Sequence, residues 1–477
     1  MGIYQEIGSR RELLVDTTLV DALSNTTLKL HEPVAAGTAI QLDKPWEGPA
    51  NGPLAVLPVG DRLHMYYRGM TTDQGDLSGR VCVALSDDSG ENWTKPELGL
   101  TAYEGNKKTN ILAYEDGSSV SRIIPWFDTR PGVSPDERIK SISSEPINGE
   151  EHNAFKDPKG PKRAVIHSSA DGFTWRRRHE YSQLISDLKN SFDGGCTLFW
   201  SEVEQQYVFY YRFMDTHRSV ARTVSSDLLT WSDPEPMTYG DSDREHLYTN
   251  NTEPYFRSPH TYIAPCARFM QGRRVLTEDQ SASINLKTSQ GIRYDGDCSE
   301  VVLLTTRAGS THYDRTFMES FVRPGPGYAN WVSRTNYPFT GISPYGPDHM
   351  QMFVARHYMQ DSWHAERFLL RTDGFASVNA SYSGGEMITK PFTFQGTELE
   401  INFRTGASGS LQVELQEATE TSSPSHLLAE SDEFIGDEID RTVRWRSSAS
   451  IQDFEGKPVR LRFLMKDADL FSLKFNQ

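Results

Sequence analysis

Carboxylates that stand beside aromatic or basic residues are the groups of this chain best suited to acid–base chemistry. Four segments supply them, at Asp43 and Glu47, at Asp128, at Asp193 and at Glu245. Cleavage of a glycosidic bond needs two carboxyl groups, one protonated and one ionised, on either side of the bond. Each of these residues also has a structural interpretation, as part of a polar loop, a β-turn or an ion pair. The pattern therefore provides candidate catalytic residues and leaves their individual roles open.

The segment 244–251 is the densest cluster of polar and aromatic residues in the sequence. It contains Glu245, and aromatic neighbours that exclude water raise the pKa of a carboxyl group, as a general acid requires. We therefore predict Glu245 as the acid. Asp128 or Asp43 would then be the base or nucleophile, kept ionised by a nearby basic residue.

Aromatic and basic side chains in the same regions are candidates for holding a substrate. Aromatic rings stack on apolar faces, and guanidinium groups bind acidic substituents. The candidates are Trp46, His246, Tyr248, Arg257, His260, Trp331 and Arg334. A place in the hydrophobic core is the alternative interpretation of Trp331.

One turn motif recurs along the first three quarters of the chain and indicates how these residues must be positioned. It occurs as Ser86–Trp93, Ser169–Trp175 and Ser225–Trp231, with a degenerate fourth copy at Arg307–Tyr313, and each copy follows a short apolar stretch. The Ser and Asp side chains can bind the turn backbone while the ring packs between strands. Units of this size must stack to bury their faces, and radial stacking gives a β-propeller. We expect the turns at its outer rim, with the three Trp side chains buried.

The pattern changes near residue 365. From there on, apolar and polar residues alternate, as in 399–403, 411–415 and 459–463, which is typical of antiparallel strands with one solvated face. Turns are expected at 406–409 and 421–425. The sequence predicts a separate β-sandwich, whereas short helices are expected only around 183–190 and 274–284.

The serial turns followed by a β-sandwich resemble glycoside hydrolase families 32 and 43, and the full motif at Ser86–Trp93 resembles the Asp-box of sialidases. The chain is also similar to a bacterial glycosidase-like group through Glu245–Asn250 and Lys466–Leu470. The characteristic N-D-P-N-G, R-D-P and E-C sequences of family 32 are absent in strict form.

This resemblance implies an all-β fold with a five-bladed propeller followed by a C-terminal β-sandwich. The expected domains are an N-terminal strap (1–30), a catalytic propeller (31–364) and the sandwich (365–477). The implied function is hydrolysis of a glycosidic bond in an oligo- or polysaccharide, with carboxylates converging in the propeller funnel. Two alternatives remain open, a glycoside phosphorylase of the family 130 type and a non-catalytic glycan-binding propeller.

The composition of the chain argues against several classes of binding partner. The 49 basic and 65 acidic residues give a net charge of −16, which argues against a nucleic-acid partner. No apolar run approaches the roughly 18 residues of a membrane span. Four widely spaced cysteines show no zinc-binding spacing, and we expect no metal or cofactor. A cytoplasmic location is expected, or a secreted one if a signal peptide was removed; the oligomeric state is left open.

Overall fold

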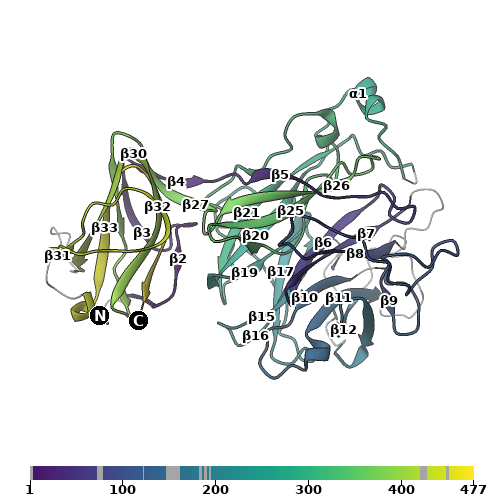
Figure 1. The fold of residues 1–477 in the computed structure, drawn as a ribbon, viewed down its shortest axis with the longest axis horizontal. Coiled ribbons are helices and arrows are strands. Elements are labelled where there is room, and N and C mark those ends of the chain that lie inside the picture. The colour runs from purple at the N-terminus through teal and green to yellow at the C-terminus, as the bar shows by residue number, and fades with distance from the viewer. Residues whose placement is uncertain are drawn as a thin grey trace.

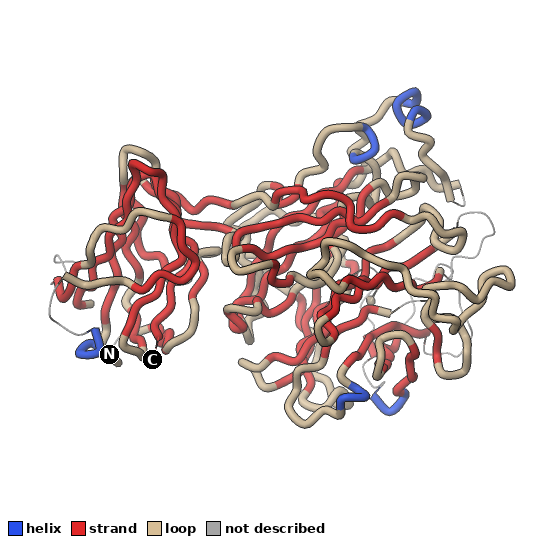
Figure 2. The backbone as a smooth tube through the Cα atoms, viewed as in Figure 1, coloured by secondary structure: helices blue, strands red, loops and turns tan. Residues whose placement is uncertain are grey.

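The computed structural model describes residues 4–71, 79–121, 123–146, 162–181, 185–186, 191–192, 195–289, 291–418, 427–446 and 451–476. These residues form two lobes that lie side by side (Figure 1), and their regular secondary structure is almost entirely strands, joined by loops (Figure 2). The larger lobe is a propeller of five antiparallel blades, so the predicted all-β, five-bladed fold is confirmed.

Blades I to III follow one another along the chain. Blade I contains β6 (Gly52–Val59), β7 (Arg62–Gly69) and β8 (Arg80–Ser86). Blade II contains β10 (Ile124–Phe127), β11 (Ile139–Pro146), β12 (Lys162–Ser169), β13 (Thr174–Arg178), β9 (Ala113–Tyr114) and β14 (Ile185–Ser186). Blade III contains β15 (Thr197–Ser201), β16 (Gln206–Met214), β17 (Arg218–Ser225) and β18 (Glu235–Pro236).

Blades IV and V complete the ring, because blade V contacts β6 of blade I. Blade IV contains β19 (Glu253–Tyr255), β20 (Ser258–Met270), β21 (Cys298–Arg307) and β22 (Ser320–Val322), and the short helix α1 (Glu278–Ser283) lies between β20 and β21. Blade V contains β23 (Tyr337–Pro338), β24 (Ser343–Tyr345), β25 (His349–Arg356) and β26 (His364–Arg371), together with β5 (Val34–Gln41). The strand β5 pairs antiparallel with β26, so the N-terminal part of the chain closes the ring.

The repeated turns follow the third strand of their blades and make the predicted backbone contacts. Asp227 accepts hydrogen bonds from the backbone of residues 229 and 230, and Asp171 accepts equivalent bonds in its own turn. Leu228 occupies the position that Gly90 and Gly172 hold in the other copies, and all three have positive φ. The Leu228 side chain is buried, which offsets the strain of that backbone conformation.

The three Trp side chains of the turns differ in exposure. Trp175 is completely buried, as predicted, whereas Trp93 and Trp231 are half-buried. The indole N–H groups of Trp93 and Trp231 donate to the backbone carbonyls of their own turns, at 3.0 and 3.2 Å. These two rings therefore lie at the rim of their blades.

The smaller lobe consists of eleven strands that form one connected sheet. They are β1 (Gln5–Gly8), β2 (Glu12–Leu13), β3 (Val20–Ser24), β4 (Thr26–Leu30), β27 (Ala376–Ala380), β28 (Gly385–Thr389), β29 (Phe392–Phe394), β30 (Glu398–Glu417), β31 (Leu427–Glu430), β32 (Asp437–Thr442) and β33 (Val459–Asn476). The apolar residues of the alternating segments are fully buried in its core: Leu399, Ile401, Phe403, Val413, Leu461 and Phe463.

Two details of this lobe differ from the sequence-based interpretation. Residues 1–30, expected as a strap, contribute four strands to its sheet, and the boundary expected at 364/365 falls inside β26 of the propeller. The turn expected at 406–409 is wrong, because β30 continues through these residues as an irregularity opposite Asp467. A Cβ atom at Gly409 would lie 2.4 Å from the Asp467 carbonyl oxygen, so this close approach requires glycine.

Candidate functional site

The first strands of all five blades start at the same end of the propeller. Because strands alternate in direction within a blade, the second strand ends there and the third strand starts there. An open pocket of about 240 Å³ lies at this end, over blades III to V. We call it the arginine–tyrosine pocket, and its lining residues are Arg218, Tyr248, Phe269, Gln271, Ile292, Arg293, Tyr294, Asp297, Ser333 and Arg334.

The ring of Tyr248 is central to this pocket. The guanidinium carbon of Arg218 lies 4.8 Å from the ring centroid, and that of Arg334 lies 5.9 Å from it. The Phe269 ring is 5.3 Å away, centroid to centroid. Sugar-binding sites commonly combine such an apolar ring surface with a few hydrogen-bonding groups. Tyr248 and Arg334 are two of the predicted substrate-binding residues, and the structure brings them together.

Asp297 is the carboxylate among the lining residues. Its Oδ1 accepts a hydrogen bond of 2.6 Å from the backbone N–H of Gly272, and its side chain is half-buried. Arg293 also lines the pocket, but its guanidinium group already binds Asp295 and Glu278, each at 2.6 Å. The charge of Arg293 is therefore compensated within the protein.

Glu47 and Asp43 lie at the strand-start end of blade I, in an ion-paired network. Glu47 is completely buried, and its carboxylate accepts hydrogen bonds from Tyr67 (2.6 Å) and Lys95 (2.8 Å). Lys95 also binds Asp43 at 2.7 Å. Trp46, expected to stack on a sugar, is instead buried in the core, where its indole N–H donates to Asn110.

Asp128 lies at the opposite end of the propeller, because it follows the first strand of blade II rather than preceding it. It is completely buried, with Lys140 at 2.7 Å and the Tyr207 hydroxyl at 2.9 Å from Oδ2. The strand β10 starts at the pocket end of the propeller and ends at Phe127, so Asp128 lies at the other end. The structure therefore does not bring Asp128 together with the carboxylates of blade I.

Glu245 is bound by two arginines of blade IV and its neighbouring loop. Its Oε1 lies 2.7 Å from Arg268, and its Oε2 lies 2.5 Å from Arg315. Both oxygens are thus occupied by structural partners. The general-acid role stays a prediction, and the geometry gives it no support, because each oxygen already binds a guanidinium group.

Of the remaining candidates, Asp193 lies outside the described residues. His246 is beside the pocket, where its Nδ1 accepts a hydrogen bond from the backbone N–H of Arg218. Trp331 is half-buried and donates to the Gly325 carbonyl.

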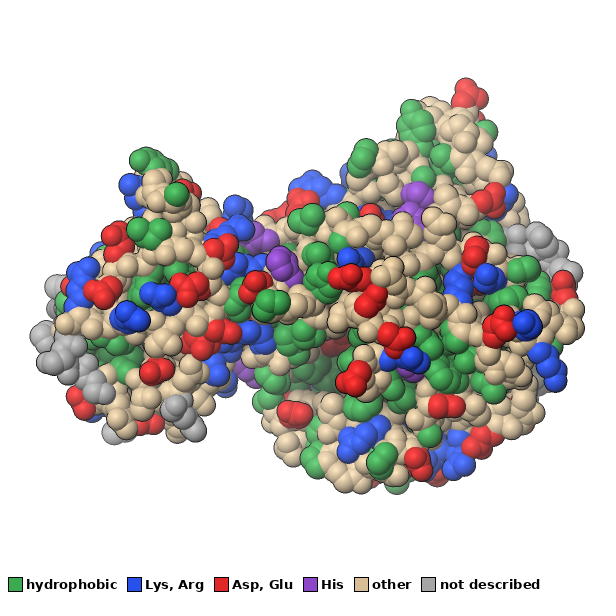
Figure 3. Space-filling view, in the orientation of Figure 1, with side chains coloured by type: hydrophobic (Ala, Val, Ile, Leu, Met, Phe, Trp, Pro, Cys, Tyr) green, Lys and Arg blue, Asp and Glu red, His purple; other side chains and the backbone are tan. Residues whose placement is uncertain are grey.

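Arg257 and His260 lie where the two lobes meet. Arg257 forms ion pairs with Asp373 and Asp440, and His260 binds Glu12 at 3.1 Å. The reason is again strand direction, since both follow β19 at the end of the propeller opposite the pocket. On the face shown in Figure 3, acidic, basic and histidine side chains lie along this junction.

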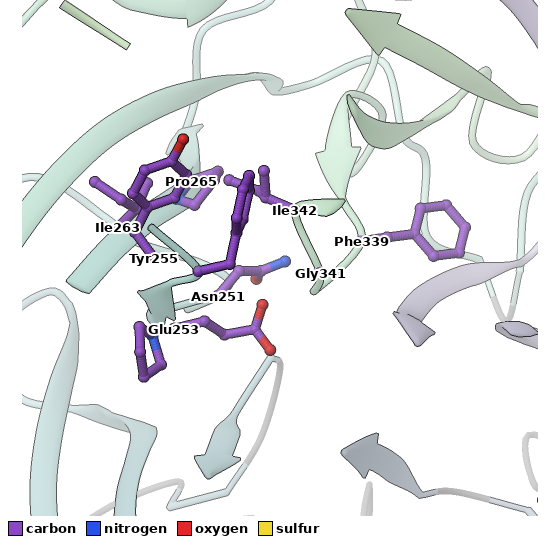
Figure 4. Close-up of a pocket in the computed structure, with 10 residues that line it drawn as sticks. Asn251, Glu253, Tyr255, Ile263, Pro265, Phe339, Gly341 and Ile342 are labelled. Carbon is purple, nitrogen blue, oxygen red and sulfur yellow. The ribbon is translucent and has the colours of Figure 1, made fainter. Parts of the chain in front are cut away.

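A second, smaller cavity surrounds Glu253 on the first strand of blade IV. It holds about 20 Å³, enough for roughly one water molecule. In Figure 4, the carboxyl group of Glu253 and the side-chain amide of Asn251 both point toward the chain segment that contains Gly341. Burial raises the pKa of Glu253 to about 7, although the Gly341 backbone N–H partly opposes this. Glu253 lines this cavity, and its carboxyl group is largely desolvated.

Arg218, Phe269 and Gln271 also line the pocket, although their sequence did not predict it. These residues are dispersed between hairpins and have no motif of their own. Counting strands would have found them, because each lies at or next to the end of a strand, on the same side of the propeller as Tyr248 and Arg334.

No cluster of three or more His, Cys, Asp and Glu side chains able to hold a metal ion occurs in the described ranges. Within the same ranges, no helix is long and apolar enough to cross a membrane. All four cysteines are buried.

No family model and no curated protein matches the chain. Among solved structures, it is similar to an N-acetylgalactosamine deacetylase from F. plautii in complex with blood group B trisaccharide (10% identity, TM-score 0.44, 73% of this chain and 96% of that chain). It is also similar to the GH32 β-fructofuranosidase of Bombyx mori (9% identity, TM-score 0.41, 95% and 94%). A third is an α-L-arabinofuranosidase from Fusarium graminearum (10% identity, TM-score 0.39, 72% and 98%). The function of this chain is inferred from its own residues.

Proposed function

We propose that the protein is a glycoside hydrolase that binds its sugar in the arginine–tyrosine pocket. The observation that carries this proposal is the pocket itself, which combines the Tyr248 and Phe269 rings with guanidinium groups and one carboxylate. It lies at the end where the first strands of all five blades begin, so residues from several blades can reach one ligand. The recurring turns and their resemblance to propeller glycosidases support the same function.

Hydrolysis requires a pair of carboxyl groups near the scissile bond. Asp297 is the candidate for the ionised member, since it lines the pocket and accepts only one hydrogen bond among those described, from Gly272. Asp193 is the candidate for the second, on the sequence argument alone.

The test is turnover of a panel of 4-nitrophenyl glycosides and natural oligosaccharides by the wild type, Asp297→Asn and Asp193→Asn. Loss of either carboxylate is expected to lower kcat about 10²–10⁴-fold with the fold intact. Glu245→Gln is the matched control and should retain near-normal turnover if properly folded. Wild-type turnover by both Asn variants would refute the catalytic proposal.

A non-catalytic glycan-binding propeller is the second candidate. It is favoured by one observation, the engagement of Glu47, Asp128 and Glu245 in structural ion pairs. Binding of a glycan by the wild type without any turnover across the panel would decide for this alternative.

A further inference from the structure

The side chains of Arg218 and Arg334 line the same pocket, and both guanidinium groups contact the ring of Tyr248. Both are within 6 Å of the Tyr248 ring centroid, and Arg212 approaches the same ring at 4.8 Å. Three cations thus surround one aromatic ring. Cation–π contacts stabilise each of them individually, but they do not cancel the positive charge.

Arg218 and Arg334 lack a carboxylate partner among the described residues. The side-chain contacts of Arg218 are long ones, 3.4 Å to Gln271 and 3.5 Å to His246 Nδ1. The charged group of Arg334 faces the rings of Tyr248, Tyr294 and Tyr358. Burial lowers the pKa of Arg218, and the nearby charges of Arg212 and Arg334 lower it further.

Other buried arginines of the same blades are paired with carboxylates. Arg268 binds Glu300 and Glu245, and Arg222 binds Glu204. Removing a cation from water is costly unless a counter-charge replaces the lost hydration. Arg218 and Arg334 differ from these arginines, because no carboxylate of the described residues compensates their charge. An anion from outside the protein would supply the missing counter-charge.

The surroundings add two independent observations. Arg334 has a positive φ of 58°, an uncommon conformation for a non-glycine residue and one that often marks a functional position. The hydroxyl of Tyr337, whose ring lies 5.3 Å from that of Tyr248, is buried without a hydrogen-bond partner within the described part of the chain.

We infer that Arg218 and Arg334 together bind an oxyanion, a carboxylate, sulfate or phosphate group. Guanidinium groups present paired N–H donors that match the geometry of such groups. The Asp297 carboxylate in the same pocket opposes this attraction, but the two uncompensated guanidinium groups outnumber it. The anion can be a substituent of the sugar or free inorganic phosphate. The guanidinium groups would bind both in the same way, through paired N–H donors. This inference adds a ligand class to the proposed function. It rests on the proposed function only in taking a sugar as the molecule that carries the anion.

Isothermal titration of the full chain with four probes tests this. The probes are methyl glucuronide, its neutral counterpart methyl glucoside, inorganic phosphate and inorganic sulfate. We expect at least one anionic probe to bind at least 10-fold more tightly than methyl glucoside. Preference for the glucuronide identifies an acidic sugar as the ligand, whereas preference for phosphate or sulfate identifies a free oxyanion.

Variants locate the binding. Arg218→Gln and Arg334→Gln should weaken binding of the preferred anion about 10–100-fold, the effect of losing a hydrogen bond between charged groups. Arg334→Lys should restore only part of it, because it keeps the charge without the paired donors. Arg446→Gln is the matched control, since this arginine lies outside the pocket in the smaller lobe and its guanidinium group is paired with Glu430, and it should bind as the wild type does.

Two results would overturn the inference: wild-type protein that binds no anionic probe better than methyl glucoside, or folded Gln variants that bind the anion normally. If the Gln variants fail to fold, the wild-type preference and Arg334→Lys still decide. The titration measures binding and not turnover, so its result is independent of the glycoside panel. Anion binding together with no hydrolysis in that panel refutes the proposed function alone. Hydrolysis of neutral glycosides without anion binding refutes this inference alone.

Discussion

Single side chains in this protein show how little residue type says about role. Glu245 and Glu253 are eight positions apart in blade IV, yet Glu245 is bound by two guanidinium groups and Glu253 lines a cavity with room for about one water molecule. The sequence drew attention to Glu245 because of its aromatic neighbours. Burial without a cationic partner among the described residues occurs at Glu253 instead, in a cavity lined by residues of blades IV and V.

Glu253 leads to a prediction about stability. Its carboxyl ionises near 4.5 in the unfolded chain and near 7 in the folded protein, so raising the pH between these values favours unfolding. The contribution of Glu253 to stability is fully present below about pH 4.5 and is lost as the pH rises through about 7. Glu253→Gln stays neutral, so its Tm relative to the wild type should rise from pH 5 to pH 8.

Thermal unfolding of both proteins at several pH values checks this. Glu433→Gln, which removes an exposed carboxylate, is the control and should show a nearly constant difference. A Tm difference for Glu253→Gln that does not change with pH would show that the carboxyl group is not held neutral in the folded protein.

At the scale of elements, sequence patterns that lie within a few residues predicted turns and strands correctly. Residues that are far apart in the sequence did not predict the pocket. The turns after β8, β12 and β17 depend on contacts within a few residues, so their sequence determines them. The alternation of Leu399, Ile401 and Phe403 likewise predicted a buried face directly. The pocket could not be recognised this way, because Arg218 and Arg334 meet only when three blades are in place.

The turn tryptophans provide a test at this scale. Trp175→Ala should lower the free energy of unfolding by about 3–5 kcal/mol, because the ring is completely buried between strands. Trp93→Ala should cost clearly less, since that ring is half-buried and keeps solvent on one side. Urea unfolding of the two variants measures the difference, and equal losses would contradict the rim placement of Trp93.

At the scale of the whole molecule, polar contacts join the lobes around the N-terminal strand β2. Glu12 of β2 is completely buried between His260 and Arg307 of blade IV, and Arg307 also binds Asp16. Burial alone would raise the pKa of Glu12, but the hydrogen bond with His260 and the charge of Arg307 lower it to about 2. The ionised form of Glu12 therefore stabilises the contact between lobes.

This stabilisation is present above about pH 4.5 and is lost as the pH falls toward 2. Glu12→Gln should cost about 1.5–3 kcal/mol at neutral pH, with Asp16 still available to Arg307. The gap in Tm between wild type and variant should shrink on acidification, as thermal unfolding from pH 7 to pH 3 would show. A gap that widens toward low pH would mean that Glu12 is not ionised at the contact.

The pairing of β5 with β26 also affects how the protein is made. Ile40 leaves the ribosome early, whereas its partner Ala365 emerges about 325 residues later. At roughly 5–20 residues per second, the closing strand waits on the order of 15–60 s for its neighbour. The strands β1 to β4 wait even longer for theirs. Throughout synthesis, the nascent chain therefore carries strands whose edges are unpaired and open to pairing with other chains.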